Sequence, residues 1–303
     1  EAGDVLSAIL RASGDGIGTR HDDARALQPL LAAATLRPEA SASPFAGRRV
    51  QLQRGYRQSD ALDLAPLATA VRQGDSAAAL TLLRQGTLAG VSFHEGLLDP
   101  LQEQREHLLA QWRALADSGD PATALAQAGR LRVLTALREG PQGARGLNHR
   151  IETLLAGANA GYFHGRLLLV TENSYRHRLF NGDVGICLRD AGAGIAAWFP
   201  GDDMAHPRAF HPAALPAHES AFAMTVHKAQ GSEFDEVWLQ LPRHDSRVLS
   251  RELVYTGLTR ARTRLHLAGS AEVLEKALQR HASRLSGLAW RLGAQAVQGE
   301  LLL

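Results

Sequence analysis

Hydrophobic residues recur at helical or strand spacing between about residues 50 and 155 of this 303-residue chain. Between residues 97 and 116, for example, Leu108, Leu109, Trp112 and Leu115 would share one face of a helix, with charged residues between them. The elements predicted in this stretch are a short strand at 50–57, helices within 62–85 and 97–116, a buried strand at 131–137 and a helix at 147–155.

Strands and helices alternate again after Pro216. The predicted elements are strands at 221–227, 237–241 and 265–268, and helices at 251–262 and 271–285. Strands that alternate with helices pair side by side in the same direction, because each helix carries the chain back across the sheet. The sequence therefore predicts an α/β fold built on a parallel sheet.

Short β-type runs separated by glycine-rich turns occupy residues 164–216 and predict a small all-β insert. Within it, Asn181-Gly182 is a strong hairpin signal, because a type I′ turn needs positive φ at both central residues. We expect three parts: a loop-rich segment at 1–49, an α/β domain of 50–163 and 217–303, and the insert at 164–216.

Composition and charge restrict the classes of protein. Hydrophobic residues make up 45% and charged residues 21% of the chain, which is typical of a folded protein. No apolar run approaches the roughly 20 residues that span a bilayer, so no membrane partner is expected. A single cysteine, Cys187, permits no internal disulfide, and the first ten residues lack signal-peptide features, so we expect the cytoplasm. The net charge of only +2 means that any nucleic-acid binding must be local.

Several kinds of site find no support in the sequence. His206, His211 and Cys187 do not follow a zinc-ligand spacing, so no metal site is predicted. There is no nucleophile elbow of a serine hydrolase and no Gly-x-x-x-x-Gly-Lys-Ser/Thr phosphate loop. The sequence begins at Glu1 with no initiator methionine and runs directly into a helical pattern, so we expect a fragment of a longer protein.

Residues 223–234, AMTVHKAQGSEF, carry the densest set of candidate functional groups. Alternation along a strand would place Thr225 and His227 on one face, and Lys228, Gln230 and Gly231 would follow at its carboxyl end, where open α/β sheets bind ligands. Glu233 could accept a hydrogen bond from a ribose hydroxyl. Taken singly, these could be a core histidine, a solvated lysine and a helix-capping acid; the uninterrupted run favours a site.

Arg260 falls at the edge of the apolar stripe of the helix predicted at 251–262, in the run YTGLTRAR. A guanidinium beside a buried face requires a nearby anion, and its planar fork suits phosphate oxygens. A nucleotide and an ion pair with Glu252 are equally compatible with the sequence at this position. Arg57, in QRGYRQ, reads by itself as an exposed arginine in a turn.

The runs AMTVHKAQGSEF and YTGLTRAR resemble motifs V and VI of superfamily 1 DNA helicases. With RGYRQSDALDLAPLATAVRQGD, ALREGPQGARGLNHRIE and LVTENSYRHRLFNGDVGICL, nearly the whole chain resembles the C-terminal half of the RecD family, a superfamily 1B group. The resemblance implies a second RecA-like motor domain of the P-loop NTPase type, interrupted by an SH3-like barrel.

The resemblance also implies residue roles. Arg57 and Arg260 would reach the γ-phosphate as catalytic arginines, and Gln230, Gly231 and Glu233 would lie by the nucleotide. The residues implied to contact DNA are Thr225, His227 and Lys228. ATP and Mg²⁺ would be held mainly by a first motor domain that this sequence lacks, so the chain should not hydrolyse ATP unaided.

The implied activity is that of an ATP-dependent 5′ to 3′ DNA helicase within exodeoxyribonuclease V, which repairs and recombines broken DNA. Its partners would be single-stranded DNA and the beta and gamma subunits. Two alternatives stay open at this point. One is a related helicase, either stand-alone or part of a conjugative relaxase; the other is a non-enzymatic module that binds DNA or a partner.

Overall fold

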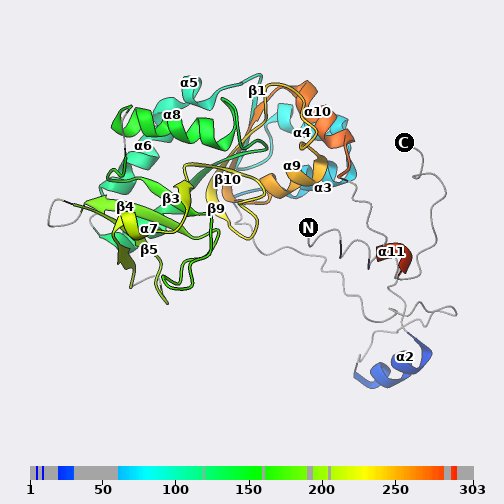
Figure 1. Cartoon of the computed structure of the whole chain (residues 1–303). Helices are drawn as coiled ribbons and strands as arrows, with labels where there is room; N and C mark the ends of the chain where they lie inside the picture. Colours follow the sequence, from blue (N-terminus) through cyan, green and yellow to red (C-terminus); the bar gives the residue numbers. More distant parts are fainter. Residues whose placement is uncertain are drawn as a thin grey trace. The chain divides into compact units, whose positions relative to one another are not determined.

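Five parallel strands form the central sheet in the computed structural model (Figure 1). In spatial order they are β1 (Val91–Glu95), β10 (Ala261–Gly269), β9 (Phe234–Gln240), β2 (Leu131–Thr135) and β8 (Ala223–Thr225). All four neighbouring pairs are parallel, which confirms the α/β class. β1 has no counterpart among the predicted elements, because it is an edge strand whose five residues are exposed or half-buried.

Helices cover both faces of this sheet (Figure 1). On one face α3 (Ala65–Gln73), α4 (Ser76–Gln85), α9 (Arg251–Leu258) and α10 (Ala271–Gln279) pack on one another. The other face carries α5 (Pro100–Glu103), α6 (Arg105–Ala116) and α8 (Ala144–Ala156), and α7 (Pro121–Ala128) packs on both α6 and the second sheet. The apolar stripes of these helices and the central strands share one continuous core.

Local sequence signals account for where these helices begin and end. The side chains of Asp75, Asp120, Ser250 and Ser270 each accept a backbone N–H from the first turn of α4, α7, α9 and α10 respectively. α10 ends at Gln279, so the helix predicted at 271–285 is too long. The reason is that Arg280 is extended, and its guanidinium binds Asp245 at 2.7 Å.

A second, antiparallel sheet has the order β6 (Arg208–Phe210), β5 (Ile195–Phe199), β4 (Val184–Arg189), β3 (Leu167–Val170) and β7 (His218–Ser220). A short helix, η2 (Pro212–Ala214), lies between β6 and β7. Leu167 and Leu169 join the main core, whereas Leu168 and Val170, which point to the opposite side, belong to a separate small core. The second sheet therefore has two apolar faces; its closure into an SH3-like barrel stays a prediction, as do the domain boundaries.

The turn at Asn181-Gly182 differs from the one that the sequence predicts. Asp183 N donates to Phe180 O at 3.0 Å, which makes Asn181 and Gly182 the central residues, but only Gly182 has positive φ. A type I′ turn needs positive φ at both central residues, so this one has the glycine requirement of type II instead. β3 and β4 are joined by the longer segment 171–183, within which Ser174 and Leu179 form an isolated bridge.

The structure describes residues 5, 9, 20–30, 61–118, 120–158, 161–189, 194–203, 206–282 and 288–291. Contacts divide the chain into two units, Tyr56–Ala282 and a second made of Glu1–Gly55 with Ser283–Leu303. The second unit contributes α2 (His21–Leu27), η1 (Gln28–Leu30) and α11 (Leu288–Arg291). Arg57 and the strand predicted at 50–57 lie outside the described residues. Among the described helices, none is long and apolar enough to cross a membrane.

Candidate functional site

The segment that carries most of the predicted site residues leaves its strand earlier than the sequence predicts. β8 ends at Thr225, and the backbone then turns, with Ala229 N donating to Thr225 O at 3.1 Å and Gln230 N to His227 O at 3.3 Å. Strand alternation therefore does not extend to His227, and the prediction that it shares a strand face with Thr225 is wrong. His227 and Gln230 are exposed, and Thr225 and Lys228 are half-buried.

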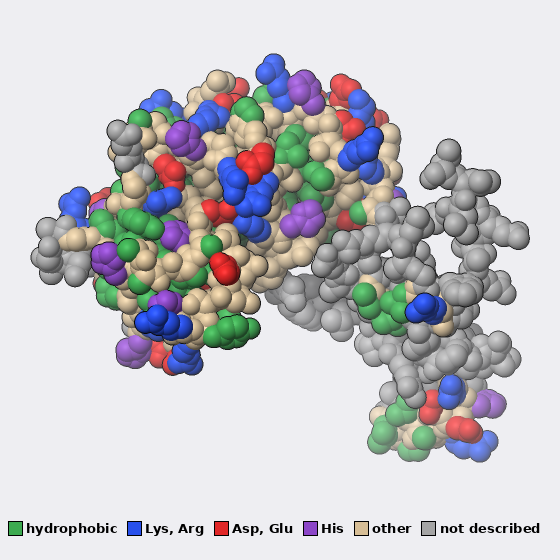
Figure 2. All heavy atoms as spheres, in the orientation of Figure 1, with side chains coloured by type: hydrophobic (Ala, Val, Ile, Leu, Met, Phe, Trp, Pro, Cys, Tyr) green, Lys and Arg blue, Asp and Glu red, His purple; other side chains and the backbone are tan. Residues whose placement is uncertain are grey.

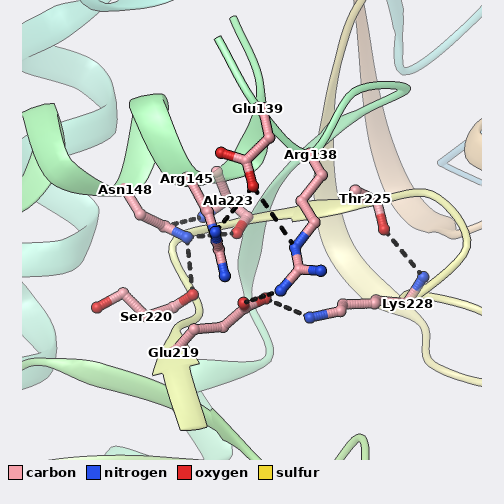
Figure 3. Close-up of polar contacts among 9 residues, drawn as sticks. All are labelled: Arg138, Glu139, Arg145, Asn148, Glu219, Ser220, Ala223, Thr225 and Lys228. Carbon is pink, nitrogen blue, oxygen red and sulfur yellow. Dashed lines mark hydrogen bonds and ion pairs between the residues drawn. The ribbon is translucent and has the colours of Figure 1, made fainter. Parts of the chain in front are cut away.

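Lys228 and Arg138 meet at one acid at the carboxyl ends of β8 and β2 (Figure 3). Lys228 Nζ lies 2.5 Å from Glu219 Oε1, and Arg138 NH2 lies 4.0 Å from Glu219 Oε2. The Thr225 hydroxyl oxygen accepts the Lys228 N–H at 3.3 Å, so its hydroxyl hydrogen can still be donated. This end of the sheet thus presents ammonium, guanidinium and hydroxyl donors together.

A second ion pair borders this group (Figure 3). Arg145, in the first turn of α8, lies 2.8 Å from Glu139, and both side chains are more than half exposed. Arg138 is exposed to a similar extent. Two exposed guanidinium groups therefore flank Thr225 and Lys228 at the carboxyl edge of the parallel sheet. We call these four residues, Arg138, Arg145, Thr225 and Lys228, the carboxyl-edge cluster.

Asn148 of α8 fixes the start of β8 (Figure 3). Its Oδ1 accepts Ala223 N at 2.7 Å, and its Nδ2 donates to Ala223 O at 2.8 Å and to Ser220 O at 2.7 Å. The side chain is buried, so these bonds satisfy groups that water cannot reach. Asn148 therefore sets the position from which Thr225 leaves the strand.

Arg132, inside β2, holds the same segment from the other side. It is fully buried, and its guanidinium donates to Ala221 O and, at 2.8 Å, to Ala128 O. Burial lowers the pKa of Arg132 to about 9, which still leaves it charged at neutral pH. The guanidinium also lies 4.8 Å from the ring centroid of Phe234, the first residue of β9. Arg132 thus ties the entrance of β8 to the start of β9.

Arg260 is not on the helix predicted at 251–262. α9 ends at Leu258, Arg260 N donates to Gly257 O at 3.2 Å, and Ala261 begins β10. The chain leaves the helix here because Phe234 N of β9 donates to Arg260 O at 2.9 Å and draws the backbone into the sheet. Arg260 therefore lies in the turn between α9 and β10, half-buried.

The guanidinium of Arg260 contacts the loop that carries the predicted nucleotide residues. Its NH1 donates to Ser232 O at 3.1 Å, its Nε to Thr256 O at 3.1 Å and its NH2 to Thr259 Oγ1 at 3.2 Å. Ser232 lies between Gly231, which has φ +88° and is exposed, and half-buried Glu233. Arg260, Gly231 and Glu233 are thus brought together, although they lie almost 30 residues apart in sequence.

Glu252, the acid considered as a partner of Arg260, has contacts elsewhere. Its carboxylate accepts Ala282 N at 2.9 Å and lies 3.3 Å from His281 Nδ1. It also lies 3.7 Å from Arg251 Nε. Glu252 therefore connects the start of α9 to the residues that follow α10. Arg260 lies beyond the opposite end of α9.

The two sets of predicted residues lie at opposite ends of the parallel sheet. Thr135 is level with both Thr225 and Gln240, which puts Thr225 at the carboxyl ends, whereas Phe234 pairs with Ala261 at the amino ends of β9 and β10. Six residues of strand separate these levels, roughly 20 Å at about 3.3 Å per residue. The prediction that Gly231 lies outside the carboxyl ends is therefore wrong, because residues 226–233 cross to the amino ends.

Sequence reasoning missed Arg132, Arg138, Asn148 and Glu219. A signal existed for two of them, since Arg132 interrupts a buried apolar strand and Asn148 lies between Leu147 and Ile151 on the buried face of a helix. Arg138, an exposed charge in a loop, gave none, and neither did Glu219, a half-buried acid in the three-residue strand β7, where a single charge shows no pattern. Figure 2 shows basic and acidic side chains intermixed on one face of the molecule, in keeping with a net charge of only +2.

Comparison with known proteins bears on this arrangement. The model of the UvrD-like helicase C-terminal domain matches residues 220–268, the stretch that contains Thr225, Lys228, Gly231, Glu233 and Arg260. The RecBCD enzyme subunit RecD of Mycolicibacterium smegmatis is 37% identical over 235 residues, 75% of this chain and 41% of that protein. The chain is a relative of the RecD family. It spans about two fifths of the length of that RecD protein.

Other similar proteins also carry RecD-type names. RecD of Haemophilus influenzae is 38% identical over 52% of this chain and 24% of that protein, and the ATP-dependent RecD2 DNA helicase of Deinococcus radiodurans is 36% identical over 50% and 22%. A solved Pif1 helicase from Bacteroides, in complex with ADP-AlF3 and ssDNA, covers 82% of this chain and 58% of its own at 13% identity and a TM-score of 0.35, which is too weak a likeness to bear on the fold. The RecD resemblance inferred from motifs V and VI is confirmed.

Proposed function

We propose that Tyr56–Ala282 works as the second motor domain of an ATP-dependent 5′ to 3′ DNA helicase of the RecD type. The observation that supports this most directly is the hydrogen bond from Arg260 to Ser232 O at 3.1 Å. This bond joins the arginine of motif VI to the loop of motif V. A site that responds to a nucleotide needs these two segments to lie next to each other.

The amino ends of β9 and β10 form the nucleotide edge in this proposal. Gly231 offers exposed backbone in a conformation that favours glycine, and apart from its two chain neighbours no described residue has an atom within 4 Å of the position a Cβ would take. Arg260 and, by resemblance, Arg57 would contact the γ-phosphate, with Gln230 and Glu233 beside the nucleotide. A planar guanidinium fork suits this role, and such an arginine contributes roughly 10³ to 10⁵ in rate.

ATP and Mg²⁺ would be held mainly by a first motor domain with its own phosphate loop. No such loop occurs in this sequence, so we expect no ATP hydrolysis by these 303 residues alone. In the closed state the second domain supplies charge-assisted hydrogen bonds to the γ-phosphate, and hydrolysis removes them. The role assigned to this chain is to complete the nucleotide site and to open when the γ-phosphate is lost.

The carboxyl-edge cluster, together with exposed His227, would contact single-stranded DNA. Arg138 and Arg145 can reach phosphates as exposed guanidinium groups, and Lys228 and the Thr225 hydroxyl add donors beside them. Such contacts read the backbone and not the bases, which suits a motor that translocates on any sequence.

The two edges are linked by residues 226–233 and by α9. A Cβ at Gly257 of α9 would lie 2.9 Å from Leu239 of β9 and 3.4 Å from Val226, directly after Thr225. Helix α9, which is followed by the turn that carries Arg260, thus packs tightly against the start of the crossing segment. A shift of Arg260 on loss of the γ-phosphate would therefore be transmitted to Thr225 and Lys228.

For the assembly, we propose a RecBCD-type exodeoxyribonuclease V complex with beta and gamma subunits, which acts in the cytoplasm on DNA breaks. The support is the name of the relatives, RecBCD enzyme subunit RecD. A stand-alone helicase is the second candidate; its support is the 36% identity to the Deinococcus radiodurans protein named ATP-dependent RecD2 DNA helicase, a name that mentions no RecBCD enzyme.

Strand displacement tests the proposal. The complete gene product is given ATP and a duplex with either a 5′ or a 3′ single-stranded tail, with and without the beta and gamma subunits. Unwinding only from the 5′ tail supports the helicase assignment, and dependence on the subunits separates the two candidates. Unwinding from the 3′ tail, or none in any combination, would refute the assignment.

A further inference from the structure

Three potential metal ligands from three different elements converge on the sheet face covered by α6. His107 belongs to α6, Glu236 to β9 and His266 to β10. Their ligand atoms all lie within 4.8 Å of one another, with His107 Nε2 2.8 Å and His266 Nε2 3.4 Å from the same Glu236 oxygen, Oε1. Among the described residues this is the one such group.

The two distances to the carboxylate are close to what a zinc ion requires. Bonds of about 2.0–2.2 Å in a tetrahedral arrangement put neighbouring ligand atoms roughly 3.3 Å apart. The separations of 2.8 and 3.4 Å from Glu236 Oε1 bracket that value, and the two imidazole nitrogens lie within 4.8 Å of each other, so the His107 side chain, which is exposed, would turn slightly to close on the ion. Two imidazoles and one carboxylate are also an established zinc donor set, with the remaining coordination position taken by water.

His266 presents an unsatisfied nitrogen to this point. Its Nε2 is buried and has no hydrogen-bond partner among the described residues; Glu236 Oε1 lies 3.4 Å away, beyond the usual hydrogen-bond range of about 2.7–3.2 Å. Its other nitrogen, Nδ1, lies 3.0 Å from His94 Nε2. A hydrogen on Nδ1 donated to His94 leaves the lone pair of Nε2 directed at the group, which is how a second residue orients a metal-binding histidine.

Ring stacking keeps these histidines in place. The Trp238 ring stacks on His266 with centroids 4.9 Å apart and on His94 at 4.6 Å. The imidazole of His266 is therefore fixed before any ligand arrives.

Glu236 presents one carboxyl oxygen, Oε1, to both histidines. Arg264 lies 2.9 Å and Gln111 3.2 Å from the other oxygen, Oε2, so both orient the carboxylate without covering Oε1.

An opening to solvent lies beside this group. A cavity of about 580 Å³ is lined by Gln111, Glu236 and Arg264 among others, and the His107 side chain is 41% exposed. An ion could enter there and keep a water molecule as a further ligand.

We propose that His107 Nε2, His266 Nε2 and Glu236 Oε1 form a binding site for one zinc ion, with His94 as the positioning residue of His266. The ion would join α6 to β9 and β10, across 129 residues of chain between His107 and Glu236. The site is separate from both the carboxyl-edge cluster and the turn of Arg260, so it stands or falls independently of the helicase assignment.

Zinc titration of the 303-residue chain, freed of metal with a chelator, tests the proposal. Calorimetry or competition with a chromophoric chelator should show one Zn²⁺ per chain, and the melting temperature should rise with zinc concentration because the ion binds the folded state. His107→Gln should weaken binding at least about tenfold, the usual scale for loss of a ligand or its partner. The absence of a stoichiometric site, or equal affinity in His107→Gln, would overturn it.

Two further measurements guard against nonspecific effects. His206→Gln is the matched control, since His206 Nδ1 also lies 2.9 Å from a carboxylate, Asp203, in an exposed pair; its zinc affinity should be unchanged, and a loss equal to that of His107→Gln would contradict the site. Cobalt bound to the native chain should show the intense visible bands of four-coordinate ligation, whereas a weak octahedral spectrum would contradict it without any variant having to fold.

Discussion

Asn148 and Ala223 are joined by two hydrogen bonds, one from Ala223 N to Asn148 Oδ1 at 2.7 Å and one from Asn148 Nδ2 to Ala223 O at 2.8 Å. The Asn148 side chain thus makes the hydrogen bonds that a neighbouring strand would otherwise make at the start of β8, two residues before Thr225. Because the pair is buried, neither backbone group of Ala223 has water as a substitute for the amide.

Asn148→Ala should therefore lower the free energy of unfolding by about 2–3 kcal/mol, since it leaves buried donors and acceptors unpaired. Urea denaturation of the 303-residue chain measures this. His149→Ala, at the next and exposed position of α8, is the control and should change stability by less than about 0.5 kcal/mol. Equal effects of the two substitutions would show that the contact does not hold β8.

Gly257→Ala should destabilise the fold although alanine is the better helix former. A Cβ there would lie 2.9 Å from both terminal carbons of Leu239, which is fully buried. We expect a net loss of about 1–2 kcal/mol after the gain in helix propensity of about 1 kcal/mol. Gly129→Ala, where the nearest atom to a Cβ is 3.8 Å away, should cause no such loss; a stabilised Gly257→Ala protein would disprove the tight packing of α9.

Cys187 should resist thiol reagents in the folded chain. Its side chain is buried in the small core of the second sheet, and burial raises its pKa to about 12, with a smaller opposing effect of Arg166. At pH 8 almost no thiolate exists, so reaction with a disulfide reagent should be roughly 10³-fold slower than in the denatured chain. Since the chain has one cysteine, the colour released reports this residue alone; rapid reaction without denaturant would show that the second sheet opens.

Arg138→Ala should weaken single-stranded DNA binding and reduce its salt dependence. Loss of one phosphate contact lowers the slope of log affinity against log salt by about 0.7 for a single strand. Fluorescence anisotropy at several salt concentrations measures both quantities. Arg84→Ala is the matched control, because Arg84 on α4 is similarly exposed and is paired with Glu95 on β1. An unchanged salt slope in Arg138→Ala would show that Arg138 does not contact DNA.

Local signals made much of the fold predictable. The helix from Arg251 and the strands around Val133 and Val237 follow from periodicity, because buried faces repeat at fixed spacing and Ser250 marks the start of α9. β1 escaped prediction because an edge strand buries little. The early end of β8 also could not be foreseen, since it depends on Thr225 accepting the Lys228 and Ala229 amides instead of continuing the ladder.

The site was predictable only in part. Thr225, Lys228, Gly231, Glu233 and Arg260 could be chosen as candidates because they lie in two short runs with a family pattern, and their roles stay predictions. Their division between opposite edges of the sheet could not, because it follows from strand register. The pair of Asn148 and Ala223 depends on a contact between residues 75 positions apart. The group of His107, Glu236 and His266 depends on three different elements coming together. No spacing in the sequence marks such contacts.

The most direct test of the proposed motor is Arg260→Ala in the complete gene product. Arg262→Ala is the control, since Arg262 lies two residues later in the sequence, on β10. ATP turnover with single-stranded DNA and the affinity for that DNA are measured on the same preparations. The predicted result is a fall in turnover of at least about 10³-fold for Arg260→Ala, with DNA affinity changed by less than about twofold, and little effect of Arg262→Ala. Normal turnover in Arg260→Ala would contradict the assignment of the α9–β10 turn to the nucleotide.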